Sequence, residues 1–386
     1  MLDCQSDHFN LPVGSHYINC AYMSPMPKAV EEAGVAAIRS KRDPSRIKPE
    51  DFFETSDLVR RAFAGIVDCD RPDRVSLIPA VSYGIATAAR NIDLGPGDAI
   101  VLLHEQFPSN VYTWRRRAAE TDAELRIVHP PPDGADRAAD WNERILDAIR
   151  RDTAVVSIPI VHWADGTRFD LERISSRAKD VGAALIVDGT QSIGALPFSF
   201  DSVRPDVLVC AGYKWLFGPY STALACWGDR FLDGVPIEEN WITRRNADDF
   251  AGLVDYEDAY EPGAVRFDVG ERSNFVLLPM LLEALNLVSS WRPDAIQSYC
   301  RDLMRPALDR ISALGYRVGP PAARGSHLFG IRMPESIGVD ALRTELTRRS
   351  VSVSVRGDAV RVAPNVYNGP EDVEALLDAL EAAVVA

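Results

Sequence analysis

The sequence is poor in the features that mark nucleic-acid-binding, membrane-spanning and secreted proteins. Its 386 residues include 42 Lys and Arg against 56 Asp and Glu, a formal net charge of −14, so the average surface repels phosphate backbones and anionic lipids. No apolar run reaches the ~18 residues that a membrane-spanning helix needs, and two acids near the start replace a basic secretion leader. We therefore expect a soluble, cytoplasmic protein that binds neither nucleic acid nor membranes.

Cysteine and histidine are sparse as well. The six cysteines are scattered without close pairs and are expected to be free thiols, which argues against a disulfide framework or a cysteine-based zinc site. The six histidines are equally dispersed, and no HExxH or similar helix-spaced pair occurs. The sequence thus predicts no metal site.

What the chain does have is a regular alternation of strand-like and helix-like segments. Short runs rich in Val, Ile and Leu predict strands at 75–80, 99–104, 154–163, 183–188 and 206–213. Helical patterns precede them at 27–42 and 56–67 and separate them at 82–92, 110–120, 141–151 and 171–182. Because runs that are apolar on both faces fit parallel strands covered by helices, we expect an α/β domain with an open sheet.

After about residue 250 the pattern changes. Helices are predicted at 275–291, 297–314, 339–349 and 369–385, with short strands around 327–333, 351–356 and 359–364. At 386 residues the chain is longer than one typical domain. We predict three parts: an N-terminal segment (1–25) that packs on the small domain, a large domain (26–255) and a small α+β domain (256–386).

Chemically useful residues gather at the predicted strand ends, where open α/β sheets bind ligands. Ser82 begins a helix after the first of these strands, a position that suits a phosphate, and another strand leads directly to Asp188. Lys214 follows the apolar run "VLVC" in "AGYKWLFGP", where an ammonium is costly to bury unless it is paired or neutral. A phosphate cradle, an aromatic face, an acid and a lysine together are what pyridoxal 5′-phosphate requires.

Two stretches carry a family resemblance. "VDGTQSIGALPFSF" and "DVLVCAGYKWLFGP" resemble the cofactor-binding signature of the class V aminotransferases, which are fold type I pyridoxal-phosphate enzymes. The similarity extends from "YINCAYMSPMP" to "VRVAPNVYN", and "EQFPSNVYTW" resembles the kynureninase, cysteine lyase and isopenicillin-N-epimerase-like branch. It implies a mixed open sheet in the large domain, a smaller α+β C-terminal domain, and a homodimer with shared active sites.

The resemblance implies catalytic and ring-binding roles. Lys214 would form the Schiff base with pyridoxal 5′-phosphate and, once the substrate amine displaces it, move the Cα proton. Asp188 would pair with the ring nitrogen, Gln191 would hydrogen-bond the ring's 3-oxygen, and Phe107 would stack on the ring. Taken alone, Asp188 is equally well explained as a turn cap. Beside Gln191 and Lys214 in the family's order, the cofactor role is favoured.

The resemblance also places the cofactor phosphate. Five residues would hold it through backbone amides or side chains: Val81, Ser82, Tyr83, Tyr213 and Trp241. Trp241 would reach the site across the dimer interface. Ser82 alone is explained equally well as a helix cap. Glu271 occupies the spot where the kynureninase branch has an asparagine, and an acid there would repel a phosphate unless it turns away.

Three residues are expected on the substrate side. Arg361 in "VRVAP" matches the arginine that receives the substrate α-carboxylate, a bidentate contact that lysine cannot copy. Because Arg361 lies between alternating valines, an exposed strand face is the alternative. His162 and Trp163 follow a predicted strand near the same place, and a structural histidine is the alternative for His162.

Departures from the family patterns bear on the reaction. Cysteine desulfurases of this family carry a persulfide-forming cysteine in the C-terminal lobe, whereas no cysteine follows Cys300, and Phe107 stands where they stack a histidine. We therefore expect a lyase that removes a Cβ substituent from an L-amino acid, of the cysteine lyase or kynureninase type. An aminotransferase or an amino-acid epimerase is the first alternative. A non-catalytic or sugar-modifying relative that keeps the fold is the second.

Overall fold

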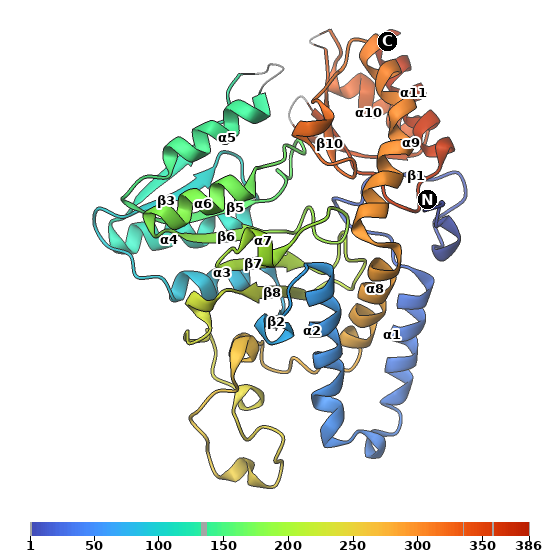
Figure 1. Ribbon diagram of the computed structural model, residues 1–386. Helices are drawn as coiled ribbons and strands as arrows, with labels where there is room; N and C mark the ends of the chain where they lie inside the picture. The colour runs from blue at the N-terminus through green and yellow to red at the C-terminus, as the bar shows by residue number, and fades with distance from the viewer. Residues whose placement is uncertain (1, 133–136, 335, 357–358, 386) are drawn as a thin grey trace.

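The structure is a computed structural model that describes residues 2–132, 137–334, 336–356 and 359–385. Figure 1 shows a broad α/β body and a smaller lobe at the upper right, which the C-terminal residues form and beside which the N-terminus lies. Within the described ranges, no helix is both long enough and apolar enough to span a membrane.

A seven-stranded sheet forms the centre of the large body. Its order is β2-β8-β7-β6-β5-β3-β4, and among the described strands of this sheet β8 runs opposite to the other six. The sheet is therefore mixed, as predicted. The strands are β2 (Val75–Ile78), β3 (Ala99–Leu103), β4 (Glu124–Val128), β5 (Thr153–Pro159), β6 (Ala184–Asp188), β7 (Val207–Ala211) and β8 (Ala223–Trp227).

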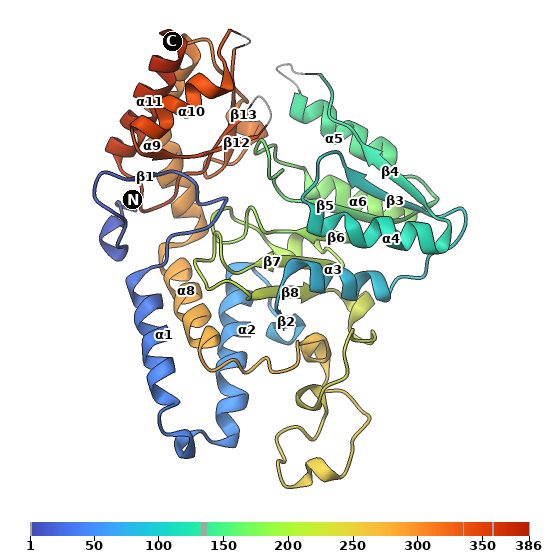
Figure 2. The ribbon, with the colours of Figure 1, turned by 180° about the vertical axis from the view of Figure 1, so that it is seen from behind.

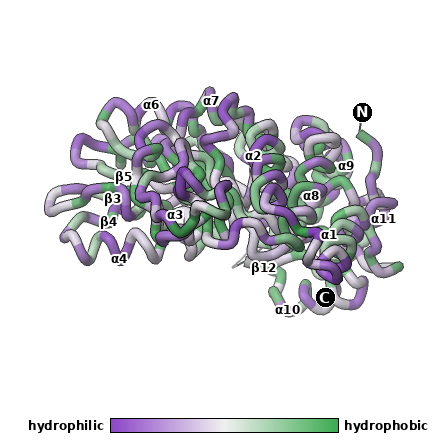
Figure 3. The backbone as a smooth tube through the Cα atoms, turned by 90° about the horizontal axis from the view of Figure 1, so that it is seen from below, coloured by the Kyte–Doolittle hydropathy of each residue, from purple (hydrophilic) through white to green (hydrophobic). Residues whose placement is uncertain are grey.

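Helices cover both faces of this sheet. Along β7, Leu208 and Cys210 belong to one hydrophobic core, whereas Val207 and Val209 belong to the other. Figure 2, seen from behind, has α3 and α4 in front of the strands, while α5 and α6 lie on the opposite face. Seen from below, hydrophobic chain segments run through the interior and many peripheral loops are hydrophilic (Figure 3). This two-sided burial explains the continuous apolar runs of the parallel strands.

The helices of the large body lie close to the predicted positions, except the short helix between β6 and β7, which was not predicted. They are α1 (Lys28–Ser40), α2 (Glu54–Ile66), α3 (Val81–Arg90), α4 (Tyr112–Thr121), α5 (Arg137–Ala148), α6 (Leu171–Val181) and α7 (Phe200–Val203). Local signals fix the ends of α6. The Asp170 side chain accepts a hydrogen bond from the Arg173 backbone N–H (3.2 Å), and Gly182 ends the helix with a φ of +79°.

The smaller lobe has its own core and an antiparallel sheet in the order β12-β13-β10-β9. Its elements are α9 (Pro293–Ala313), β9 (Arg317–Val318), β10 (Phe329–Arg332), α10 (Val339–Arg348), β11 (Val351–Ser352), β12 (Ser354–Arg356), β13 (Ala359–Val362) and α11 (Pro370–Val385). The N-terminal strand β1 (His16–Tyr17) pairs in parallel with β11. Helix α8 (Leu277–Trp291) packs against α1 and α2 of the large body. The residue bounds of the three predicted parts stay a prediction.

Between β8 and α8 the chain makes an excursion of short 3₁₀ turns, which projects below the body in Figure 1. The fully buried carboxylate of Asp268 holds the end of this excursion against the large body. It accepts hydrogen bonds from Arg60, from Arg272 Nη1 (2.5 Å) and from the backbone N–H of Leu77 (2.7 Å). Because Leu77 belongs to β2, this network attaches the excursion to the strand that leads into the site described next.

Candidate active site

A cavity of about 360 Å³ opens at the carboxyl ends of β2, β6 and β7. This is the edge where open α/β sheets bind ligands, and the volume suits a small molecule. Asp188 is the one acid, and Lys214 the one base, among the described residues that line it. The lining comprises Pro79, Ala80, Val81, Ser82, Phe107, Ser109, Asp188, Thr190, Ala211, Tyr213, Lys214, Tyr220, Ser221 and Thr222.

Lys214 lies in the turn that follows β7 and is only 5% exposed. The next residues, Trp215 and Leu216, are buried in the core and hold the turn in place. Burial lowers the pKa of the Lys214 amine to about 8, against the opposing effect of Asp188, while Arg361 lowers it further. A substantial neutral fraction near pH 8 makes this amine a nucleophile and a base, which an ordinary surface lysine is not.

Asp188 ends β6 and is 7% exposed. Its Oδ1 accepts a hydrogen bond from the Thr190 backbone N–H (3.0 Å), so it also caps the following turn. Burial raises the pKa of this carboxyl, and the hydrogen bonds of Thr190 and the charge of Lys214 only partly offset the effect. A protonated ring nitrogen beside it would favour the ionised form.

The far end of the cavity has the chemistry of a phosphate site. Helix α3 begins at Val81 directly after β2, so its N-terminal backbone N–H groups and the Ser82 hydroxyl border the cavity. Tyr213 lines the same cavity. Tyr83 does not: its backbone N–H donates to Ala80 O (3.1 Å), and its half-buried ring packs in the core on the α3 side of the sheet.

Gln191 lies behind the cavity, with its amide held between two partners. Its Oε1 accepts a hydrogen bond from Trp215 Nε1 (3.0 Å), and its Nε2 donates to the carbonyl of Ala21 (3.1 Å). The indole can only donate and the carbonyl can only accept, so the amide orientation is fixed. The second hydrogen of Nε2 is not used by either bond.

Phe107 lines the cavity, and its ring centre lies 5.3 Å from Lys214 Nζ. Trp163 meets Phe107 edge-on with ring centres 5.5 Å apart, and its Nε1 donates to Glu105 O (2.6 Å). His162 is buried outside the lining: its Nε2 lies 3.2 Å from the backbone oxygen of His104. A direct substrate contact by His162 or Trp163 stays a prediction.

Arg361 lies on β13 with only 2% of its surface exposed, so the alternative of an exposed strand face is wrong. Its Nη1 donates to Trp163 O (2.9 Å), and its Nη2 donates to Ser354 Oγ (3.2 Å). Arg361 is also close enough to lower the pKa of Lys214. The structure thus brings the arginine of the small lobe to the same region as the lysine of the large body, outside the cavity lining.

Two residues of the excursion lie apart from the cavity. Trp241 is 38% exposed and packs in an aromatic cluster with Phe52, Phe53 and Phe250. Its predicted contact across a dimer interface stays a prediction. Glu271 is exposed, with a φ of +58°, and does not line the cavity.

The residues present fit pyridoxal 5′-phosphate. The start of α3 and the hydroxyls of the lining suit its phosphate, and the raised pKa of Asp188 calls for a positive partner such as the ring nitrogen. Lys214, with its lowered pKa, supplies the amine for the aldehyde. The described lining holds no second charged pair that would compete with these roles.

Sequence reasoning missed five hydroxyl-bearing residues that line the cavity: Ser109, Thr190, Tyr220, Ser221 and Thr222. The sequence could have indicated Thr190, because it stands between the two predicted site residues Asp188 and Gln191 in "DGTQ". The segment 220–222 follows "FGP" and returns to the site because Gly212 N donates to Thr222 O (2.8 Å). A Cβ on Gly212 would lie 2.5 Å from the Thr222 hydroxyl, so this close approach requires glycine.

Curated proteins similar to this chain include aminotransferases and desulfurases. An uncharacterized aminotransferase of Bacillus subtilis is 24% identical over 346 residues, which is 87% of this chain and 86% of the relative. A cysteine desulfurase of Haloferax volcanii is 24% identical over 75% of this chain and 69% of its own.

Solved structures are similar over nearly the whole chain. The cystine C-S lyase C-DES, in complex with cysteine persulfide, gives a TM-score of 0.84 at 18% identity and covers 96% of this chain and 98% of that one. The cysteine desulfurase of Thermococcus onnurineus gives 0.82 at 19% identity, over 99% and 98%. At these identities the likeness establishes the fold. Because the family model "Aminotransferase class-V" matches residues 50–369, the chain belongs to the class V aminotransferases, a family of pyridoxal 5′-phosphate enzymes.

Proposed function

We propose that this protein is a pyridoxal 5′-phosphate-dependent lyase that removes a Cβ substituent, in the first place a sulfur group, from an L-amino acid. The observation that carries the proposal is the buried Lys214, with its lowered pKa, in one cavity with Asp188 and the start of α3. Support for sulfur comes from the relatives named cysteine desulfurase and the structural neighbour named cystine C-S lyase.

The chain's own residues divide the work. Bound pyridoxal 5′-phosphate supplies an electron sink for the charge that develops at the substrate Cα. Lys214 would hold the cofactor through its amine and would accept the Cα proton of the substrate, a task that its pKa of about 8 suits. Asp188 pairs with the ring nitrogen, and Arg361 binds the substrate α-carboxylate.

The two thiols whose charges act on Lys214, those of Cys20 and Cys210, favour elimination over persulfide transfer to the protein. A sulfur acceptor must be a thiolate. Cys20, whose Sγ lies 3.9 Å from the Lys214 backbone oxygen, has its pKa raised to about 12 by burial, and burial also raises the pKa of Cys210. No cysteine follows Cys300 in the sequence. The leaving group would therefore depart to solvent, and with water the remainder becomes pyruvate and ammonia.

Product analysis of the purified protein tests the reaction. With added cofactor, L-cysteine or L-cystine should give pyruvate and ammonia in equal amounts, together with the sulfur product. Lys214→Ala should abolish this production, whereas Lys179→Ala, which removes an exposed lysine, should leave it unchanged. The lyase proposal would be overturned if sulfur amino acids gave no pyruvate and L-kynurenine gave no alanine.

Attachment of the cofactor can be tested without any substrate. The chain has only five lysines: Lys28, Lys41, Lys48, Lys179 and Lys214. Borohydride reduction followed by digestion and mass spectrometry should place the pyridoxyl group on Lys214. An adduct on another lysine, or none, would remove the basis for every role assigned above.

Transamination is the second candidate, because the Bacillus subtilis relative is named an aminotransferase. An aminotransferase would convert amino donors to keto acids only when a keto-acid acceptor such as pyruvate is supplied. Parallel reactions with and without that acceptor separate the two candidates.

A further inference from the structure

The imidazole of His327 lies directly behind the loop that carries the candidate cofactor residues. His327 precedes β10 in the small lobe and is fully buried. Its Nε2 lies 2.8 Å from the backbone oxygen of Gln191, and its Nδ1 lies 2.7 Å from Nε2 of Gln297 on α9. Its ring meets Trp215 edge-on, with centres 4.6 Å apart.

The hydrogen-bond partners of Gln297 decide how this imidazole is protonated. Gln297 Nε2 also donates to Ala195 O (2.7 Å), and Gln297 Oε1 accepts from the Ser326 backbone N–H (2.9 Å). A carbonyl can only accept and an amide N–H can only donate, so the Gln297 amide has one orientation. It therefore presents an N–H to His327 Nδ1, which must accept. The ring hydrogen then sits on Nε2 and donates to Gln191 O.

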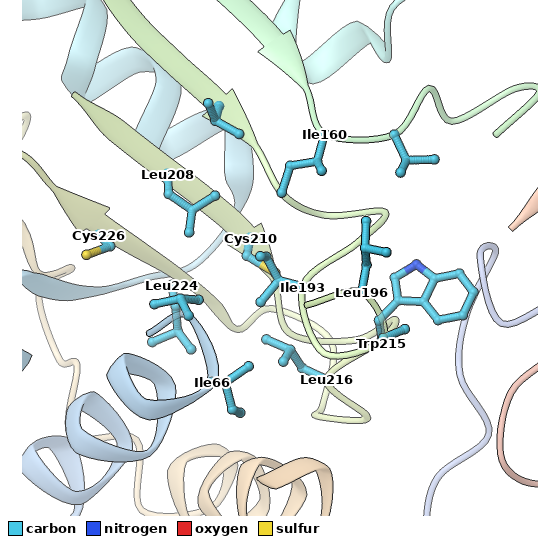
Figure 4. Packing of buried hydrophobic residues seen from close by; sticks show 14 of the residues in the cluster. Ile66, Ile160, Ile193, Leu196, Leu208, Cys210, Trp215, Leu216, Leu224 and Cys226 are labelled. Carbon is cyan, nitrogen blue, oxygen red and sulfur yellow. The ribbon is translucent and has the colours of Figure 1, made fainter. Parts of the chain in front are cut away.

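This arrangement holds the candidate cofactor loop from two sides. Gln297 binds Ala195 and His327 binds Gln191, so both contacts fall on the loop that runs on from Asp188. Figure 4 shows Trp215 beside Leu196, with Ile193 close by. Trp215 follows Lys214, donates to the Gln191 side chain and touches the His327 ring. The imidazole thus contacts neighbours of both the lysine and the acid.

The surroundings keep the imidazole neutral. Burial lowers the pKa of His327 to about 4; its hydrogen bond to Gln191 works against this, and Arg168 lowers the pKa further. A second ring proton would point Nδ1–H at the Gln297 N–H. Close packing leaves little room for a shift, because a Cβ on Gly325 would lie 2.4 Å from His327 Cε1 and 2.5 Å from Nδ1.

We propose that His327, oriented by Gln297, is a positioning residue of the active site. It sets Gln191 and Trp215 so that the remaining amide hydrogen of Gln191 faces the cofactor ring and Lys214 keeps its place. The inference rests on the proposed function, since it assigns the small lobe a part in shaping the cofactor site. It predicts that a second proton, on His327 Nδ1, opposes the Gln297 N–H, displaces Gln297 from His327 and Ala195, and weakens cofactor binding.

Two variants test this. His327→Phe keeps a buried ring but leaves Gln191 O without its donor, and should weaken pyridoxal 5′-phosphate binding to the apo-protein at least fivefold and alter the absorption and visible circular dichroism of the bound cofactor. Gln297→Glu places a carboxylate beside Nδ1, which favours the protonated ring. The carboxylate also accepts the added Nδ1–H, which removes the conflict with an N–H at position 297, so the pH at which cofactor is lost should fall by about one unit or more.

The matched control is Gln5→Glu, which adds the same charge near the chain start, where Gln5 donates to Asp3 O. A pH midpoint for Gln297→Glu equal to that of Gln5→Glu would overturn the inference, as would a loss of affinity below fivefold in a folded His327→Phe. If His327→Phe does not fold, the Gln297→Glu midpoint decides alone. If the unaltered protein takes up no cofactor, the proposed function fails instead, which keeps the two failures apart.

Discussion

Acid should destabilise the folded protein through one buried group, His327. Its pKa is about 4 in the folded protein and 6.5 ordinarily. Between pH 6.5 and pH 4 the unfolded chain therefore binds a proton on His327 that the folded protein does not bind. The unfolding free energy falls as the pH drops through this range. At about 1.4 kcal/mol per pKa unit, the full loss is about 3 kcal/mol of unfolding free energy.

Urea denaturation at pH 7, 6, 5 and 4 measures this loss. His327→Phe removes the titrating group, so its unfolding free energy should fall with acid by about 3 kcal/mol less than that of the unaltered protein. Carboxylates that titrate in this range are present in both proteins and cancel in the difference. His129→Phe, which removes an exposed histidine, should keep the full pH dependence.

The same pH dependence in His327→Phe and in the unaltered protein would refute the reasoning. An equal pH dependence would mean that the His327 imidazole has the same pKa in the folded and the unfolded protein. Either it stays neutral down to pH 4 in both, or water already reaches it in the folded protein. The second explanation would also remove the basis for the tautomer assigned from Gln297.

Three further predictions concern other parts of the molecule. Arg361→Lys should raise KM at least tenfold and change kcat less, because lysine cannot make the bidentate carboxylate contact; equal KM values would contradict this. Asp268→Asn should lower the unfolding free energy by about 3–5 kcal/mol, because Arg60 and Arg272 stay buried without their counter-charge; urea denaturation tests it, and a loss below about 1 kcal/mol would refute it. Sedimentation should show a dimer for the unaltered protein, and Trp241→Ala should weaken that dimer. A monomeric unaltered protein would contradict the shared active site.

The motifs at strand ends made the centre of the site predictable. Parallel strands align their carboxyl ends, so Asp188 and Lys214, which lie far apart in the sequence, had to meet once both were placed after apolar runs. The strands β4 and β8 were not predicted. β4, "ELRIV", is an edge strand with exposed and polar positions, and β8, "ALACW", begins with small residues of weak strand propensity.

The support behind the site was beyond sequence reasoning. Gln297 and His327 show no spacing or periodicity that indicates a role, because their function depends on which backbone groups meet them in the folded chain. Tyr83 was expected to offer its backbone N–H to the phosphate because its neighbours in the sequence suit that role. In the structure those neighbours border the cavity, but the first turn of α3 already uses the Tyr83 N–H. Local pattern predicts where an element lies more reliably than which of its polar groups stays available.

The pairing of the N-terminal segment with the last part of the chain bears on how the protein is made. Gln5 N donates to Val366 O, Cys20 N donates to Ala363 O, and β1 pairs with β11, while Ala21 holds the Gln191 amide. The segment around β1 is thus translated long before the small-lobe residues that pair with it. This segment therefore stays unpaired until the small lobe has been made, and a deletion within it would remove the Ala21 carbonyl that holds Gln191 before it disturbed the central sheet.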